Sequence, residues 1–319
     1  MNIKHAVMIG MMGRVADKFH EYHPPKNLAQ RLRDARCVQG AGGIEVVYPS
    51  EFDHPDETIK LIKESGLEVS AVNLNVKSEK KWESGSFTSP DARVRRAAVD
   101  ALKSAMDLAV ALGAGMVSCC PLIDGHNFAF EVDYLNQWGW LEEGIHDGAA
   151  HRSDVKVSLE YKITESRNFN LLSDMGRALY LCERVGLPNV GVTMDAGHAL
   201  LARETPAEVM SMASLSGRLF YVHLNDNDRY WDWDMVPGAV NFWDLLEVLF
   251  YLEKIDWQGW VAYDVVVRDG GLVETMQAAI ENVEAARKLL HKIGIDRLQA
   301  CIDRSSTAAT FKFLIESLL

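Results

Sequence analysis

The sequence predicts an α/β protein of 319 residues that folds as one closed (β/α)8 TIM barrel with a C-terminal helical extension. Three observations support this fold class. Eight apolar, strand-like runs alternate with helix-length segments at a steady pitch, as a parallel barrel requires. The last four runs each end in a side chain of a type that binds metals. No glycine-rich G-x-G-x-x-G turn follows the first run, which argues against a dinucleotide-binding sheet.

The expected elements follow from the periodicity of apolar residues and from turn signals. Strands are expected near 3–10, 43–47, 68–74, 115–120, 154–160, 190–195, 218–224 and 259–266. Helices are expected at 26–37, 55–65, 90–112, 129–145, 169–186, 204–214, 241–254 and 272–292. We expect residues 1–294 to form the barrel. The tail of residues 295–319 is expected to be helical and to pack on the barrel or on a neighbouring subunit.

The clearest helix is the one expected at 90–112. Ser89 can cap its N-terminus, and Pro90 suits the first helical position. Gly113 or Gly115 is expected to end it, because glycine readily adopts the left-handed conformation that closes a helix.

Composition excludes several classes of partner. The net charge of −12 and the pI of about 5.3 oppose binding to nucleic acid or to an anionic membrane, because phosphate binding uses clustered Lys and Arg. No apolar stretch approaches the roughly 20 residues of a membrane span. The five cysteines show neither C-x-x-C nor zinc-finger spacing, which favours reduced thiols. We therefore expect a cytoplasmic protein with a small ligand that is not strongly anionic.

Four candidate metal ligands stand at the C-terminal ends of strand-like runs. The runs DVKVSLE, NVGVTMD, RLFYVH and GWVAYD end in Glu160, Asp195, His223 and Asp264. A single acid at a strand end is usually a helix cap or a solvated loop residue. Four together are harder to dismiss, because a barrel builds its active site at this end of the strands. Several carboxylates with one imidazole suit Mn²⁺, Mg²⁺ or Co²⁺.

A second set of polar residues follows two of these strands. His198 lies three residues after Asp195, and Asp232 and Asp234 bracket a tryptophan in the loop HLNDNDRYWDWD. One or two ions are therefore expected, with Asp195 placed to bridge two sites. Lys162 is two residues beyond Glu160 and points the same way on an extended chain. It could polarise a substrate oxygen, or it could simply pair with Glu160 or Glu165.

These segments resemble the metal-dependent sugar isomerases of the xylose isomerase-like barrel superfamily. The segment EYKITESR (160–167) is similar to the E-P-K-P-N-E-P-R motif of xylose isomerases at both glutamates, the lysine and the arginine. The segment MDAGHALLA (194–202) resembles that family's acid-x-x-His segment. The loop HLNDNDRYWDWDMVPG is similar to that of the bacterial L-rhamnose isomerases.

The resemblance implies an aldose–ketose isomerase that acts on a sugar by a metal-mediated 1,2-hydride shift. One ion would be held by Glu160, Asp195, His223 and Asp264, and a second by His198, Asp232, Asp234 and the shared Asp195. The expected catalytic residues are Glu160, Lys162, His198 and Asp264. Lys162 would stabilise developing charge on the substrate O1. Since relatives are commonly dimers or tetramers, a homodimer or homotetramer is expected.

Other functions remain open at this point. The ketose 3-epimerases of the same superfamily, and a lyase on a 3-oxo sugar, would use one metal with carboxylates as acid and base. Glu160 and Arg229 would match the epimerase pattern, with Arg229 binding substrate. Asp264 stands where those enzymes carry Glu, and a side chain shorter by one methylene retracts by roughly 1.5 Å. A nuclease of the endonuclease IV type would need a basic face, and a non-catalytic binding protein would leave the ligand set unexplained.

One departure from xylose isomerases concerns the opening of the sugar ring. Those enzymes use an early His and Asp pair, whereas the third strand here ends in VNLN, without histidine. His126 is the replacement we consider. Asn73 and Asn75 are expected to contact sugar hydroxyls.

Overall fold

The structure is a computed structural model that describes residues 1–266 and 268–318, and it confirms the closed barrel. Its barrel strands are β1 (Lys4–Met8), β4 (Ala41–Tyr48), β5 (Glu68–Leu74), β6 (Met116–Cys119), β8 (Lys156–Glu160), β10 (Val190–Asp195), β11 (Leu219–His223) and β12 (Trp260–Tyr263). They pair in parallel in the order β1, β12, β11, β10, β8, β6, β5, β4, and β4 closes on β1. Each of these barrel strands lies where the apolar pattern placed one.

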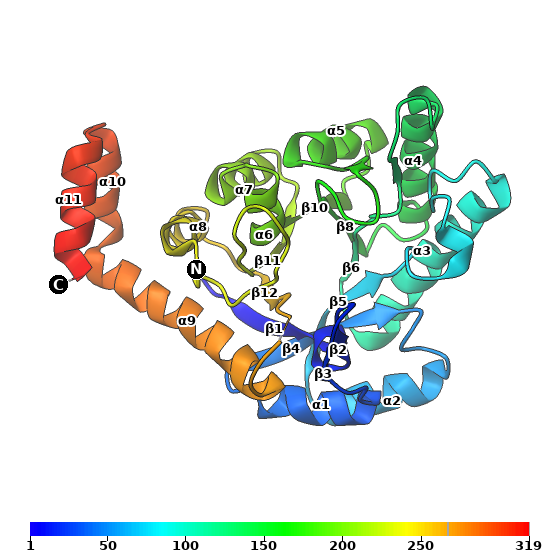
Figure 1. Ribbon diagram of the computed structural model, residues 1–319, viewed down its shortest axis with the longest axis horizontal. Helices are drawn as coiled ribbons and strands as arrows, with labels where there is room; N and C mark the ends of the chain where they lie inside the picture. Colours follow the sequence, from blue (N-terminus) through cyan, green and yellow to red (C-terminus); the bar gives the residue numbers. More distant parts are fainter. Residues whose placement is uncertain (267, 319) are drawn as a thin grey trace.

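Helices surround this barrel (Figure 1). They are α1 (Leu28–Cys37), α2 (Pro55–Ser65), α3 (Ala92–Leu112), α4 (Tyr134–Ala149), α5 (Met175–Val185), α6 (Ala196–Leu201), α7 (Pro206–Leu215), α8 (Phe242–Lys254) and α9 (Leu272–Ile293). Single turns of 3₁₀ helix lie at Ile9–Met12 (η1) and Lys80–Trp82 (η2). Short antiparallel pairs join β2 (Val15–Ala16) to β3 (Glu21–His23), and β7 (Gly125–His126) to β9 (Phe169–Asn170).

Three helix starts differ from the sequence expectation. The helix expected from residue 129 is α4, which begins at Tyr134 and is capped by Asp133. Asp91, not Ser89, caps α3: its carboxylate accepts a hydrogen bond from the Arg93 amide, while the Ser89 hydroxyl accepts one from the Asp91 amide. The expected start at 169 is also wrong, because Phe169 and Asn170 pair with β7 and the helix begins only after Asp174. At the other end of α3, Gly113 has the expected left-handed backbone, with φ of +74°.

The interior of the barrel changes from apolar to polar along the strands. Ala6, Ala71, Met116, Tyr221 and Ala262 form a separate buried cluster. On several strands the next inward position, two residues further on, is polar: Asn73, Ser118, His223 and Asp264. The apolar layer therefore closes the barrel beneath a polar layer at the C-terminal ends of the strands.

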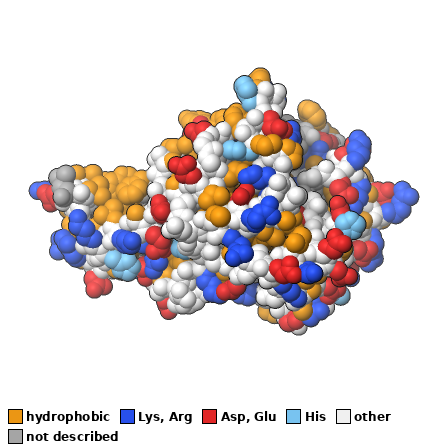
Figure 2. Space-filling view, turned by 90° about the horizontal axis from the view of Figure 1, so that it is seen from below, with side chains coloured by type: hydrophobic (Ala, Val, Ile, Leu, Met, Phe, Trp, Pro, Cys, Tyr) orange, Lys and Arg blue, Asp and Glu red, His pale blue; other side chains and the backbone are white. Residues whose placement is uncertain are grey.

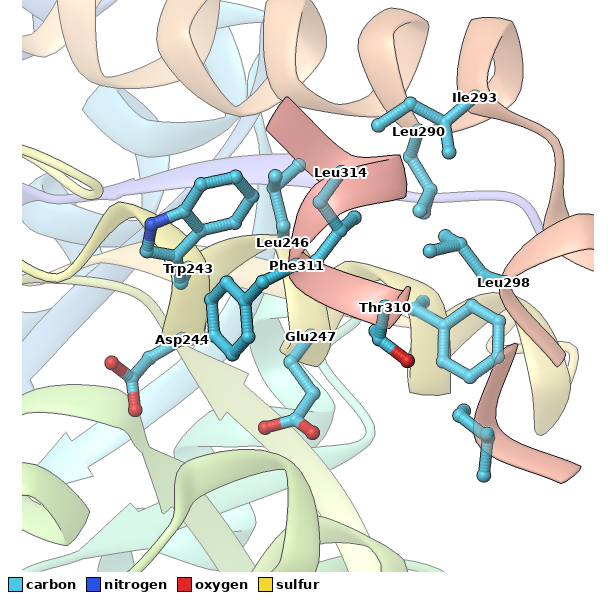
Figure 3. Close-up of a pocket in the computed structure, with 12 residues that line it drawn as sticks. Trp243, Asp244, Leu246, Glu247, Leu290, Ile293, Leu298, Thr310, Phe311 and Leu314 are labelled. Carbon is cyan, nitrogen blue, oxygen red and sulfur yellow. The ribbon is translucent and has the colours of Figure 1, made fainter. Parts of the chain in front are cut away.

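The C-terminal extension consists of α10 (Ile295–Asp303) and α11 (Thr307–Leu318), which project from the barrel beyond α9 (Figure 1). Neither helix contains a buried residue. Hydrophobic side chains gather on this projecting end (Figure 2), and Ile302, Phe311 and Ile315 are 45%, 50% and 50% exposed. A cavity of about 300 Å³ lies between the extension and helices α8 and α9, with Trp243, Leu246 and Leu314 among its lining residues (Figure 3).

No helix among the described residues combines the length and the apolar character needed to cross a membrane. The boundary at residue 294 and the expected dimer or tetramer stay predictions.

Candidate metal centre

The strand register brings the four candidate ligands to one level of the barrel. Glu160 pairs with Thr193 on β10, and Asp195, two residues further, pairs with His223 on β11. His223 is in turn level with Ala262, two residues before Asp264. Because residues two apart share a face of a strand, all four side chains point into the barrel at its C-terminal end.

These four side chains form a compact cluster. Each of Glu160, Asp195, His223 and Asp264 offers one ligand atom, and these atoms lie within 4.8 Å of one another. His223 Nδ1 lies 3.6 Å from both Glu160 Oε2 and Asp195 Oδ2. His223 Nδ1 and Asp264 Oδ1 are buried without a hydrogen-bond partner, which is unusual for polar atoms. A ring nitrogen and a carboxylate oxygen that lack hydrogen-bond partners, surrounded by further carboxylates, are suitable ligand atoms for a hard or borderline divalent cation.

The charges of the cluster are unbalanced in the absence of a cation. Burial and the nearby Asp195 carboxylate raise the pKa of Asp264 to about 7. Burial, Asp264 and Asp232 raise the pKa of Asp234 well above its usual value. Burial acts in the same direction on Glu160, but the His223 and His198 side chains outweigh it and hold the Glu160 pKa well below its usual value. A divalent cation would relieve the repulsion among the carboxylates.

The raised pKa of Asp264 predicts a pH-dependent stability of the metal-free protein. Its carboxyl titrates near 3.8 when unfolded and near 7 when folded, so the folded state holds an extra proton between these values. The free energy of unfolding therefore falls as pH rises from 3.8 to 7, by about 4 kcal/mol at about 1.36 kcal/mol per pKa unit. We expect Asp264→Asn, which cannot ionise, to raise the melting temperature at pH 8 by about 5–10 °C.

Calorimetry in the presence of a chelator would test this expectation at pH 5 and pH 8. The gain should be smaller at pH 5, where the wild-type carboxyl is largely protonated. An equal gain at both pH values would show that asparagine acts through packing rather than through the missing charge. With Mn²⁺ added at pH 8, the order should reverse, because the wild-type protein keeps all four ligands.

A second buried network adjoins the cluster. His198 Nδ1 lies 3.0 Å from Glu160 Oε1, and His198 Nε2 lies 3.1 Å from Asp232 Oδ2. Lys162 Nζ lies 2.7 Å from that same Asp232 oxygen and also pairs with Glu165. Burial favours a neutral Lys162, but these two carboxylates outweigh it and raise the pKa of the amine. Lys162 therefore stays positively charged next to the cluster.

The predicted second set of ligands lies next to the first, but the ligand atoms of its members do not gather around one point as those of the first set do. Asp232 is buried between His198 and Lys162, whereas Asp234 lies 3.4 Å from the Asn225 amide nitrogen. Within residues 1–266 and 268–318, the first set of four is the one group whose ligand atoms converge closely enough to share an ion. Occupancy of a second site stays a prediction.

Asn225 positions Asp195 and was missed by the sequence reasoning. Its amide nitrogen donates to Asp195 Oδ2 at 3.1 Å, and its oxygen accepts from the Gly197 amide at 2.7 Å. A Cβ atom at position 197 would lie 2.2 Å from the Asn225 oxygen, so glycine is required there. Asp195 also caps α6, since its Oδ1 accepts from the His198 amide at 2.8 Å.

Glu45 is a second missed residue, and it lies on β4 in the middle of the polar layer. The side chain is fully buried, and its Oε2 lies 3.1 Å from His223 Nε2. Asn73 donates its amide hydrogen to Glu45 Oε1 at 2.8 Å, and its expected contact with substrate stays a prediction. An acid inside an otherwise apolar strand pattern is the sequence signal that could have identified Glu45.

The remaining predicted substrate contacts are engaged elsewhere. Asn75 accepts from the amides of Lys77 and Ser78 and so closes a local turn. The Arg229 guanidinium donates twice to Asp244 on α8, at 2.9 Å each. The His126 ring packs against Tyr134 and Phe169, with centroids 5.0 and 5.1 Å away. A direct role in substrate binding stays a prediction for all three.

Comparisons with known proteins agree with this fold. Residues 34–289 match the family described as the xylose isomerase-like TIM barrel. The chain is 28% identical over 207 residues to the xylose isomerase of Thermus thermophilus, which covers 63% of this chain and 53% of that protein. It is 27% identical over 219 residues to the xylose isomerase of Thermus caldophilus, covering 66% and 56%. The chain thus spans about half the length of the curated relatives it matches.

Solved structures show the same architecture. An L-ribulose 3-epimerase superposes with a TM-score of 0.70 at 17% identity, covering 95% of this chain and 98% of that one. A 3-keto-D-glucoside 4-epimerase from E. coli superposes with a TM-score of 0.68 at 16% identity, covering 89% and 99%. At such low identity these likenesses show the fold alone.

Proposed function

This protein belongs to the xylose isomerase-like TIM barrel family, and we propose that it is a divalent-metal-dependent isomerase that interconverts an aldose and a ketose by a 1,2-hydride shift. The observation that carries the proposal is the four-ligand cluster at the strand ends, with the buried Lys162, His198 and Asp232 beside it. This arrangement combines a cation site with a fixed positive charge that does not depend on a metal.

Each part of the site has a task in this reaction. Glu160, Asp195, His223 and Asp264 would hold Mn²⁺, Mg²⁺ or Co²⁺, which as a Lewis acid polarises the oxygens of a bound sugar. Lys162 donates from a charged amine and can stabilise negative charge on a substrate oxygen. His198 lies within 3.1 Å of both Glu160 and Asp232, so it can hold a proton between these two carboxylates.

A second candidate is a ketose 3-epimerase, and the specific observation favouring it is that a single four-ligand site is complete by itself. In that reaction Glu160 and Asp264 would act as acid and base at C3. Asp264 is the weaker part of this assignment, because an aspartate reaches less far toward carbon than a glutamate. Lys162 would also have no evident task in it.

Product analysis in deuterated water separates the two functions. The Mn²⁺-loaded protein would be incubated with pentoses, hexoses, deoxyhexoses and tetroses, and the products followed by NMR. A ketose that retains the hydrogen moved from C2 supports the hydride shift, because that hydrogen never exchanges with solvent. An epimer carrying deuterium at C3 would overturn the isomerase proposal and assign the acid and base roles to Glu160 and Asp264.

A further inference from the structure

Glu45 is a fully buried carboxylate whose two oxygens have different partners. Oε1 accepts from the Asn73 amide at 2.8 Å and from the Ser118 hydroxyl at 2.7 Å. Oε2 faces His223 Nε2 at 3.1 Å. These partners come from β5, β6 and β11, so the side chain connects three strands across the interior of the barrel. An ionised group in such a place is costly unless all its contacts are satisfied.

The arrangement fixes which nitrogen of His223 carries a proton. A carboxylate can only accept hydrogen bonds, so Nε2 must donate to Glu45. A neutral imidazole then has its lone pair on Nδ1, the atom that faces Glu160 and Asp195 at 3.6 Å and has no hydrogen-bond partner. We propose that Glu45 is a positioning residue that holds His223 in its Nε2–H tautomer, so that Nδ1 is free to bind the cation. This inference rests on the proposed metal dependence and assigns Glu45 a task within it.

The isosteric variant Glu45→Gln provides a sharp test. Asn73 and Ser118 both donate to the position of Oε1, so the carbonyl oxygen of the introduced glutamine should lie there. Its NH₂ group then faces His223 Nε2 and donates to it, which moves the ring proton to Nδ1 and blocks the metal-binding atom. We expect Mn²⁺ affinity to fall about 10–100-fold, as for the loss of other groups that orient a metal-bound histidine. Titration followed by electron paramagnetic resonance measures this directly.

The double variant Glu45→Gln with Asn73→Asp separates the tautomer from the charge. The introduced aspartate accepts from the glutamine NH₂, which turns the glutamine carbonyl toward His223 and restores an acceptor for Nε2–H. Its net charge equals that of the wild-type protein, with the carboxylate moved from one residue to its neighbour. We expect Mn²⁺ affinity to return to within about 3-fold of wild type, while Asn73→Asp alone should bind weakly because two carboxylates then face each other.

The outcomes distinguish this inference from the proposed function. Failure of the wild-type protein to bind Mn²⁺ would overturn the metal dependence itself. Wild-type binding with unchanged affinity in Glu45→Gln, or weak binding in both the single and the double variant, would overturn the role of Glu45. If the variants do not fold, ¹⁵N NMR of the imidazole in Mg²⁺-loaded wild-type protein decides. A proton on His223 Nε2 supports the inference, and a proton on Nδ1 contradicts it.

Discussion

Glu160→Gln is expected to lower the Mn²⁺ affinity on the order of 10³-fold and to reduce turnover at least as much, because it removes a charged ligand rather than a group that orients one. Glu160 is 4% exposed and contacts both His198 and His223, so its negative charge is lost from a buried site where solvent does little to stabilise a cation. The substitution conserves size and leaves β8 intact. The effect should therefore appear in metal binding and activity while the fold is retained.

Glu142→Gln is the matched control, since Glu142 forms a salt bridge with Arg184 on the outer helices α4 and α5. It should leave Mn²⁺ binding unchanged. Electron paramagnetic resonance titration gives the affinity, and circular dichroism checks that both variants fold. Wild-type affinity in Glu160→Gln would remove Glu160 from the ligand set and with it the central element of the proposed site.

Lys162→Met should lower kcat by about 10²–10³-fold with little change in KM, because a charge that acts mainly on the transition state is lost. It should also destabilise the protein by about 3 kcal/mol, because the buried Asp232 then loses one of its two basic partners and keeps His198. The two effects have different origins, and a further substitution separates them.

The double variant Lys162→Met with Asp232→Asn removes both partners of the ion pair. Most of the lost stability should return, because no uncompensated charge stays buried. Turnover should stay low if Lys162 stabilises charge on a substrate oxygen, because its amine is still missing. Recovery of kcat together with stability would show that Lys162 only neutralises Asp232. Steady-state kinetics and thermal unfolding on the same samples measure the two quantities.

The sequence predicted the barrel and the four-ligand cluster because both depend on short-range pattern. Parallel strands place their C-terminal ends at one face, so a residue such as Asp264 needs only its position in a strand to be assigned to the site. Starts of helices were less predictable. Ser89 and Asp91 are both good capping residues, and only the path of the chain decides that Asp91 caps α3.

Contacts between residues far apart in the sequence could not be predicted from it. The side chains of Glu45 and His223 are in contact although they lie 178 residues apart in the sequence, and no local pattern predicts such a contact. Arg229 has the spacing of a substrate-binding residue, but its backbone φ of +66° and the facing Asp244 direct its guanidinium to α8. Loop conformations of this kind depend on the completed tertiary structure, so they could not be inferred from residue spacing.

Asp195 connects the chemistry of the centre to the backbone of a helix. Its Oδ2 belongs to the ligand cluster, while its Oδ1 holds the first turn of α6 through the His198 amide. Binding of a cation at the centre would therefore be thermodynamically coupled to fraying of that turn through one carboxylate. Hydrogen exchange of the amides at the start of α6 should therefore slow when a cation binds. This rate would report metal binding through the backbone, without any substrate.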